Sequence, residues 1–187
     1  MLKIHIPEKE LYNEETNEFK TFKAMDLQLE HSLISLSKWE AKWKKPFLDD
    51  RTDKTEEEML DYILCMNMTQ NVDPEFPSLL SSEQKKEISD YINEKQTATW
   101  FSEDSDKDFK RYGGRNGTVM TSEVLYYLMV ACQIPFECQK WHLSRLITLI
   151  RVYQEKNKDP KKMSKSEILA RNKRLNDARR KALGTKG

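Results

Sequence analysis

Two short stretches near the start of the chain alternate between apolar and polar side chains. They are residues 2–6, LKIHI, and residues 25–29, MDLQL. A period of two residues is typical of a strand that buries one face. Turn-forming residues lie between the two stretches, around Glu14–Asn17. The pattern therefore predicts a small antiparallel hairpin or sheet over residues 1–31.

From residue 32 onward, apolar positions recur every three or four residues, which is the period of a helix. Ser32 stands where an N-cap is expected, and Pro46 closes this first helical segment. Trp39 and Trp43 lie on its apolar stripe. We expect both tryptophans to anchor the helix on its neighbours, with the surrounding lysines facing water or a partner.

Four more helical segments follow in the body of the chain. The first opens with a Thr-x-x-Glu capping box at Thr55 and ends before the breaker NVDPEFP. The third begins at Thr121 or Ser122 and ends at Pro135. A long polar loop over residues 102–120 precedes it, and loops of this length are usually mobile or functional, so we expect a mobile loop. The fourth is apolar on two sides, which favours the centre of a bundle. The four segments cover residues 55–66, about 82–101, 122–133 and 136–158.

A last helix is predicted over residues 164–183. Ser164 and Glu167 form a second capping box, and Gly184 stands just beyond the end, where helices favour glycine. The linker NKDPKK separates this segment from the body. The apolar residues form only a thin seam, consisting of Ile168, Leu175, Ala178 and Ala182.

These elements place the chain in the α+β class, mainly α, with a bundle of about five helices behind the N-terminal sheet. We divide it into a hairpin or sheet at 1–31, a helical bundle at 32–155 and a basic linker and helix at 156–187. The period change near residue 31 marks the first boundary, and the proline-containing linker marks the second.

Charge is distributed unevenly between these parts. Residues 156–187 contain twelve Lys or Arg and three Asp or Glu, a net charge of +9. Because the whole chain carries +1, residues 1–155 carry −8. The basic tail could therefore be attracted to an acidic body, either that of its own chain or that of a neighbour. We expect docking on another protein chain, with docking on its own body as the alternative.

Several protein classes do not fit the sequence. No apolar run approaches the roughly 20 residues that span a bilayer, and the N-terminus has no apolar signal core. The three cysteines are odd in number and lack a CxxC spacing, so we expect reduced thiols and a cytosolic protein.

His31 and Ser32, beside Glu30, contain residue types that nucleophilic catalysis uses. Such a site needs a base within reach of the hydroxyl and an oxyanion site, which sequence neighbours seldom provide. The motif G-x-S-x-G is absent as well. We therefore expect a cap serine and a structural histidine, no catalytic residue, and a protein that is not an enzyme.

Cys138 and His142 are spaced to share one face of the predicted helix, with Cys132 and Cys65 as further possible zinc ligands. Structural zinc sites usually combine two such short spacings, and only one is present. We expect thiols packed as small apolar groups, without a metal or a cofactor. The glycine-rich GGRNG at 113–117 lacks the spacing of a phosphate loop, so we expect only conformational freedom there.

Nucleic-acid contact has two candidate segments. Trp39 and Trp43 alternate with Lys38, Lys42, Lys44 and Lys45, a mixture seen in proteins that bind single strands. Their helical spacing favours packing instead.

The basic tail is either a solvated helix or one that docks on a partner or a second copy. The candidate partner-binding residues are Ile168, Arg171, Leu175, Arg179 and Arg180, together with Trp39 and Trp43.

Three stretches also carry a family resemblance: residues 27–48, residues 97–101 and the run from Thr121 to the final glycine. They resemble small proteins encoded in the tail-gene region of long-tailed bacteriophages, which are commonly assigned as tail assembly chaperones. The resemblance covers most of the chain.

The resemblance implies a protein of the host bacterial cytoplasm that takes part in virion morphogenesis. It would coat the tape measure protein, keep its helices soluble and recruit the tail tube protein, whose subunits displace it. Two alternatives stay open. The chain could be a virion component of the neck, tail or baseplate, or an accessory protein that binds nucleic acid through its basic tail.

Overall fold

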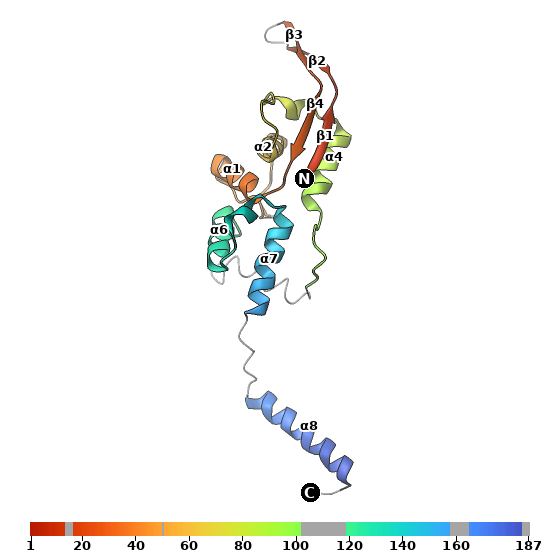
Figure 1. Cartoon of the computed structure of the whole chain (residues 1–187), viewed down its shortest axis with the longest axis vertical. Helices are drawn as coiled ribbons and strands as arrows, with labels where there is room; N and C mark the ends of the chain where they lie inside the picture. The colour runs from red at the N-terminus through yellow and green to blue at the C-terminus, as the bar shows by residue number, and fades with distance from the viewer. Residues whose placement is uncertain (14–16, 50, 102–118, 158–164, 185–187) are drawn as a thin grey trace. The chain divides into compact units, whose positions relative to one another are not determined.

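The computed structural model describes residues 1–13, 17–49, 51–101, 119–157 and 165–184. The chain forms two compact units, Met1–Tyr153 and Gln154–Gly187. The fold is α+β and mainly α, as predicted, with a small antiparallel β part at the N-terminus (Figure 1).

The β part consists of two strand pairs. Strand β1 (Leu2–Ile6) pairs with β4 (Met25–Leu29), and β2 (Lys9–Asn13) pairs with β3 (Glu18–Phe22), both antiparallel (Figure 1). Pro7 follows β1 and lacks the N–H that would continue the ladder, which helps to separate the pairs. The β1–β4 pair buries one face, formed by Ile4, Ile6, Leu27 and Leu29. The two strands predicted from the alternation are confirmed as the β1–β4 pair. The β part forms two separate two-stranded sheets.

The first two helices begin at the predicted caps. Helix α1 (Leu33–Trp43) starts after Ser32, whose hydroxyl oxygen accepts a hydrogen bond from the Ser35 N–H. Helix α2 (Glu56–Met66) starts after Thr55, and both bonds of its capping box to Glu58 are present. These local side-chain bonds satisfy backbone donors that a helix leaves unpaired at its start.

The next segment differs from the prediction in two places. The expected breaker contains a short helix, α3 (Phe76–Leu79), whose Phe76 is completely buried. Helix α4 (Ser82–Asn93) ends eight residues earlier than Phe101, the expected end. Beyond it the Gln96 N–H donates to Ser144 Oγ at 3.2 Å, so a tertiary bond replaces a helical one.

The single helix predicted over 136–158 is wrong. After helix α6 (Ser122–Ala131), the chain forms a 3-10 turn, η1 (Phe136–Lys140), and then helix α7 (Leu143–Lys156). Between them, His142 forms a β-bridge with Ser32, and the Leu143 N–H donates to the His31 carbonyl at 2.7 Å. This pairing with a segment more than 100 residues away in sequence interrupts the helix.

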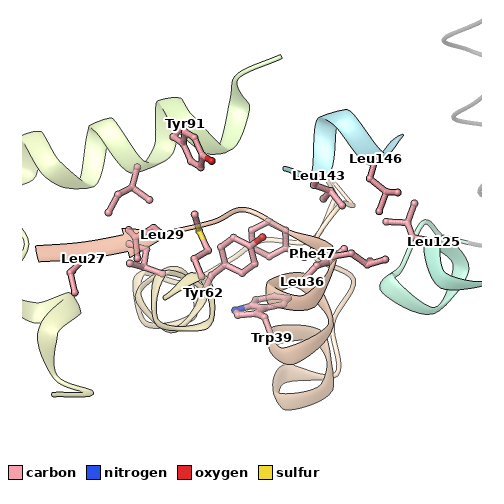
Figure 2. Packing of buried hydrophobic residues seen from close by; sticks show 14 of the residues in the cluster. Leu27, Leu29, Leu36, Trp39, Phe47, Tyr62, Tyr91, Leu125, Leu143 and Leu146 are labelled. Carbon is pink, nitrogen blue, oxygen red and sulfur yellow. The ribbon is translucent and has the colours of Figure 1, made fainter. Parts of the chain in front are cut away.

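The core of the first unit joins the β1–β4 pair to its helices (Figure 2). Phe47 stacks on Tyr62 with ring centroids 3.8 Å apart, and Trp39 meets Phe47 edge-on. Leu125 of α6, with Leu143 and Leu146 of α7, continues the core (Figure 2). The core therefore joins segments from both halves of the unit.

The second unit contains helix α8 (Lys165–Leu183). Gly184 follows it with a φ of +64°. Glycine adopts this left-handed backbone conformation without steric strain, so the predicted glycine stop is confirmed. Ser164 and the loop over residues 102–118 lie outside the described residues. Within the described chain, none of the helices has the length and apolar character needed to cross a membrane.

Candidate functional site

Helix α8 is the candidate docking site that the sequence singled out. Its 19 residues include seven Lys or Arg and two Asp or Glu, a net charge of +5. All of its described side chains are exposed, including Leu169 at 68% and Leu175 at 46%. A helix that buries none of these side chains lacks the tertiary packing that supplies most helical stability in proteins.

The candidate residues of α8 do not all share one face. Positions 171, 175 and 179 are four residues apart, so Arg171 and Arg179 flank Leu175 one turn away on each side. Ile168 and Ala182 lie two turns from Leu175, at the spacing of a helix-pairing seam. Arg180 is five residues from Leu175 and lies on another side of the helix. The structure thus supports one stripe with arginines along it.

The two tryptophans lie elsewhere, in the packing between α1 and α2. Trp39 is fully buried and donates from Nε1 to the Glu58 carbonyl at 2.7 Å. Trp43 is half-buried and donates to Asp61 Oδ2 at 2.8 Å. Their predicted role as anchors is confirmed. As a candidate partner-binding residue Trp39 needs correction, because its side chain has no exposed surface to offer.

Two of the lysines expected to face water or a partner are exposed to solvent and also form ion pairs with α2. Lys42 pairs with Asp61, and Lys45 pairs with Glu58. The hydrogen bond from Lys45 lowers the pKa of the Glu58 carboxyl, and the bond to Asp61 raises the pKa of Lys42. The basic charge of this segment is therefore partly neutralised within the unit.

His31 and Ser32 have separate structural partners. His31 is buried with Nδ1 2.5 Å from the Tyr62 hydroxyl oxygen, and Ser32 Oγ lies 3.0 Å from Ser35 Oγ. Burial lowers the pKa of His31 to about 3, and the neighbouring His142 contributes to the shift. An imidazole with so low a pKa is neutral at physiological pH. Their positions and hydrogen bonds are those of a structural histidine and an N-cap serine.

The candidate metal ligands are distributed over different elements. Cys65 is in α2, Cys132 caps α6 and Cys138 is in the turn η1, while His142 follows that turn. Cys138 and His142 therefore do not share a helix face, which corrects the predicted spacing. Among the described residues, no three His, Cys, Asp or Glu side chains are grouped to hold a metal ion. The segment 113–117 lies outside those residues.

An apolar groove between α2 and α4 was not predicted. Met59, Leu60 and Ile63 line it from α2, and Ile88 and Ile92 line it from α4. Glu56 and Lys85 also line it, and they form an ion pair across it at 3.0 Å. Apolar residues spaced three and four apart are visible in the sequence of both helices, but the sequence does not show that the two apolar stripes face each other.

The candidate surfaces are thus a basic helix with an exposed apolar stripe and an apolar groove between two acidic helices. In both, apolar side chains recur at helical spacing, which is the pattern of residues by which amphipathic helices contact other proteins. Comparison of the chain with protein-family models, curated proteins and solved structures finds no match.

Proposed function

We propose that the chain is a non-enzymatic assembly factor that binds an amphipathic helix of another protein through α8. The observation that carries the proposal is the exposed stripe of α8, where Leu175 lies between Arg171 and Arg179. A leucine flanked by arginines at helical spacing suits an acidic amphipathic partner helix. Apolar contact would supply affinity, and charge would favour encounter and orientation.

The family resemblance gives this partner a concrete identity. The client would be the long, helical tape measure protein of a phage tail, bound in the host bacterial cytoplasm before the tail tube protein displaces the chain. Transient binding suits a helix that gains its packing only on the partner, because the ordering cost limits affinity. No cofactor is required for such a role.

Co-purification from infected cells tests the proposal directly. The full chain should retain the tape measure protein, identified by mass spectrometry. Replacing Ile168→Asp together with Leu175→Asp should reduce the recovered client more than Lys173→Ala with Arg174→Ala, because the first pair removes the apolar stripe. Recovery of no tape measure protein by the wild-type chain would contradict the proposed client.

Mass spectrometry of purified virions separates an assembly factor from a virion component of the neck, tail or baseplate. An assembly factor should be absent from the mature particle. Recovery of the chain in stoichiometric amount would instead support the structural role.

The basic charge of α8 keeps nucleic-acid binding as a second candidate function. A gel-shift assay over a salt series tests it. Binding through phosphate contacts should weaken steeply as salt is added, because counterions are released on binding. The assembly proposal expects no shift at physiological ionic strength.

A further inference from the structure

We infer that α8 of one copy of this chain occupies the groove between α2 and α4 of a second copy. The inference rests on the proposed role of α8 as a docking helix and names its partner in the absence of a client. Reciprocal exchange would give a two-fold dimer with two equivalent contacts, the commonest form of self-association.

The shape of the groove suits a helix. Its apolar residues follow the stripe of α2 at Met59 and Ile63 and that of α4 at Ile88 and Ile92. Two helices of 11 and 12 residues are about 16–18 Å long, so they can seat three turns of a third helix. The interval from position 168 to position 175 spans about 10 Å, well within that length.

Charge favours α8 as the occupant. Together, α2 and α4 carry seven Asp or Glu and two Lys, a net charge of −5, against +5 on α8. Three of the α2 carboxylates, Glu56, Glu58 and Asp61, are already paired with lysines. Glu57, Glu83, Glu87 and Asp90 are exposed and have no ion pair within the described part of the chain.

These free carboxylates attract α8 without having to touch it. They lie on the two helices that form the groove, within about one helix diameter of its floor, and this distance is close to the Debye length at physiological salt. A basic helix whose leucine stripe enters the groove would keep its arginines near the acidic faces. The same chain therefore contains both a groove and a helix that match in length and are opposite in charge.

Exchange between copies would also cover the exposed leucine of α8 and the partly exposed Met59, Leu60 and Ile92 of the groove. In the dimer each stripe covers the other, and a client helix that engages α8 would release the groove. The resting pair would thus protect the docking helix until a client competes for it.

The test begins with sedimentation equilibrium of the full chain over a concentration series. We expect a reversible dimer. Leu175→Asp should raise its dissociation constant at least about tenfold, because it places a charged side chain in an apolar stripe that the dimer would bury. Leu169→Asp makes the same change on the same helix, about 120° around it, and should alter the constant less than about threefold.

A second pair of variants tests the groove. Ser89 is exposed and lines the groove, so Ser89→Arg should obstruct it without disturbing the core. Glu87→Gln changes the net charge by the same amount on the opposite side of α4, so it should weaken the dimer only slightly, through the loss of one attracting carboxylate. Equal effects of Ser89→Arg and Glu87→Gln would overturn the inference.

Mixing the two disabled chains gives the decisive result. The Leu175→Asp chain keeps an intact groove and the Ser89→Arg chain keeps an intact α8, so one of the two contacts is restored in a mixed pair. The mixture should associate more strongly than either chain alone. A monomeric wild-type chain, or a mixture that associates no better than its components, would overturn the exchange.

Client capture by the Ser89→Arg chain separates this inference from the proposed function. That chain retains its docking helix, so it should still recover the tape measure protein after losing the dimer. A wild-type chain that dimerises as described but captures no client would contradict the proposed function and support the exchange. A monomeric chain that captures the client would do the reverse.

Discussion

Glu40 of α1 accepts a hydrogen bond at Oε2 from the backbone N–H of Ser122, 82 residues later in the chain, at 2.7 Å. Its other oxygen accepts from the Phe47 N–H at 2.9 Å. The carboxylate is buried, so one side chain holds both the exit from α1 and the start of α6. Thr121 makes no side-chain cap bond to α6, and Glu40 serves this helix start instead.

Replacing Glu40 should therefore be costly. We expect Glu40→Ala to lower the free energy of unfolding by roughly 2–4 kcal/mol, because two buried N–H donors lose their acceptor. Chemical denaturation measures the change. Glu87→Ala, at an exposed position of α4 without an ion pair in the described chain, should change it by less than about 0.5 kcal/mol. Equal effects would mean that water replaces the Glu40 bonds.

The buried His31 predicts a pH dependence of stability. Burial lowers its pKa to about 3, against the ordinary histidine value of 6.5, so the unfolded chain binds a proton more readily than the folded one. Stability should fall as pH drops below 6.5, by about 1.4 kcal/mol for each pH unit from this group, until pH approaches the folded pKa. Unfolding by urea between pH 7 and pH 5 measures the slope.

His142 is shifted in the same direction, chiefly by burial, and should add to that slope. His31→Gln removes one of the two groups. It should lower stability at pH 7, where the bond to Tyr62 is disturbed, and reduce the loss between pH 6.5 and pH 5. An unchanged slope would show that His31 becomes protonated in the folded state without penalty.

Phe76 tests whether the short helix α3 belongs to the core. It is completely buried, whereas Phe136 is 55% exposed. Phe76→Ala should cost about 3–5 kcal/mol in unfolding free energy, and Phe136→Ala should cost less than about 1 kcal/mol. The comparison removes the same atoms at both positions, so similar losses would contradict the burial of Phe76.

The contrast between α2 and α3 shows what can be predicted from the sequence. Helix α2 begins with a capping box of neighbouring residues, Thr55 and Glu58, and this local signal is enough to place its start. Helix α3 has only four residues in a proline-containing segment, so no helical period can be detected. This helix forms because Phe76 packs in the core, and that packing depends on residues distant in sequence.

The same reasoning explains the other misplaced boundaries and the missed groove. The predicted helix over 136–158 breaks where His142 pairs with Ser32, a contact that no local pattern reports. The stripes of α2 and α4 can be seen in the sequence, but their facing position depends on the packed sheet and helices. For α8 the sequence pattern and the charge predict a helix and a docking role, but they do not identify the partner.

The last prediction concerns removal of the second unit. Ending the chain after Lys158 deletes α8 and leaves the unit Met1–Tyr153, whose core contains no described residue beyond Ile150. The shortened chain should therefore fold with nearly the same circular dichroism per residue in its body. Its melting temperature should stay within about 4 °C of the full chain under conditions where both are monomeric, since about 1 kcal/mol corresponds to such a shift. Thermal unfolding at low protein concentration gives the comparison. At higher concentration the full chain should gain stability and the shortened chain should not, because only the former can associate through α8. Unfolding of the body on truncation would show that α8 is an integral part of its core, and would contradict a separable docking helix.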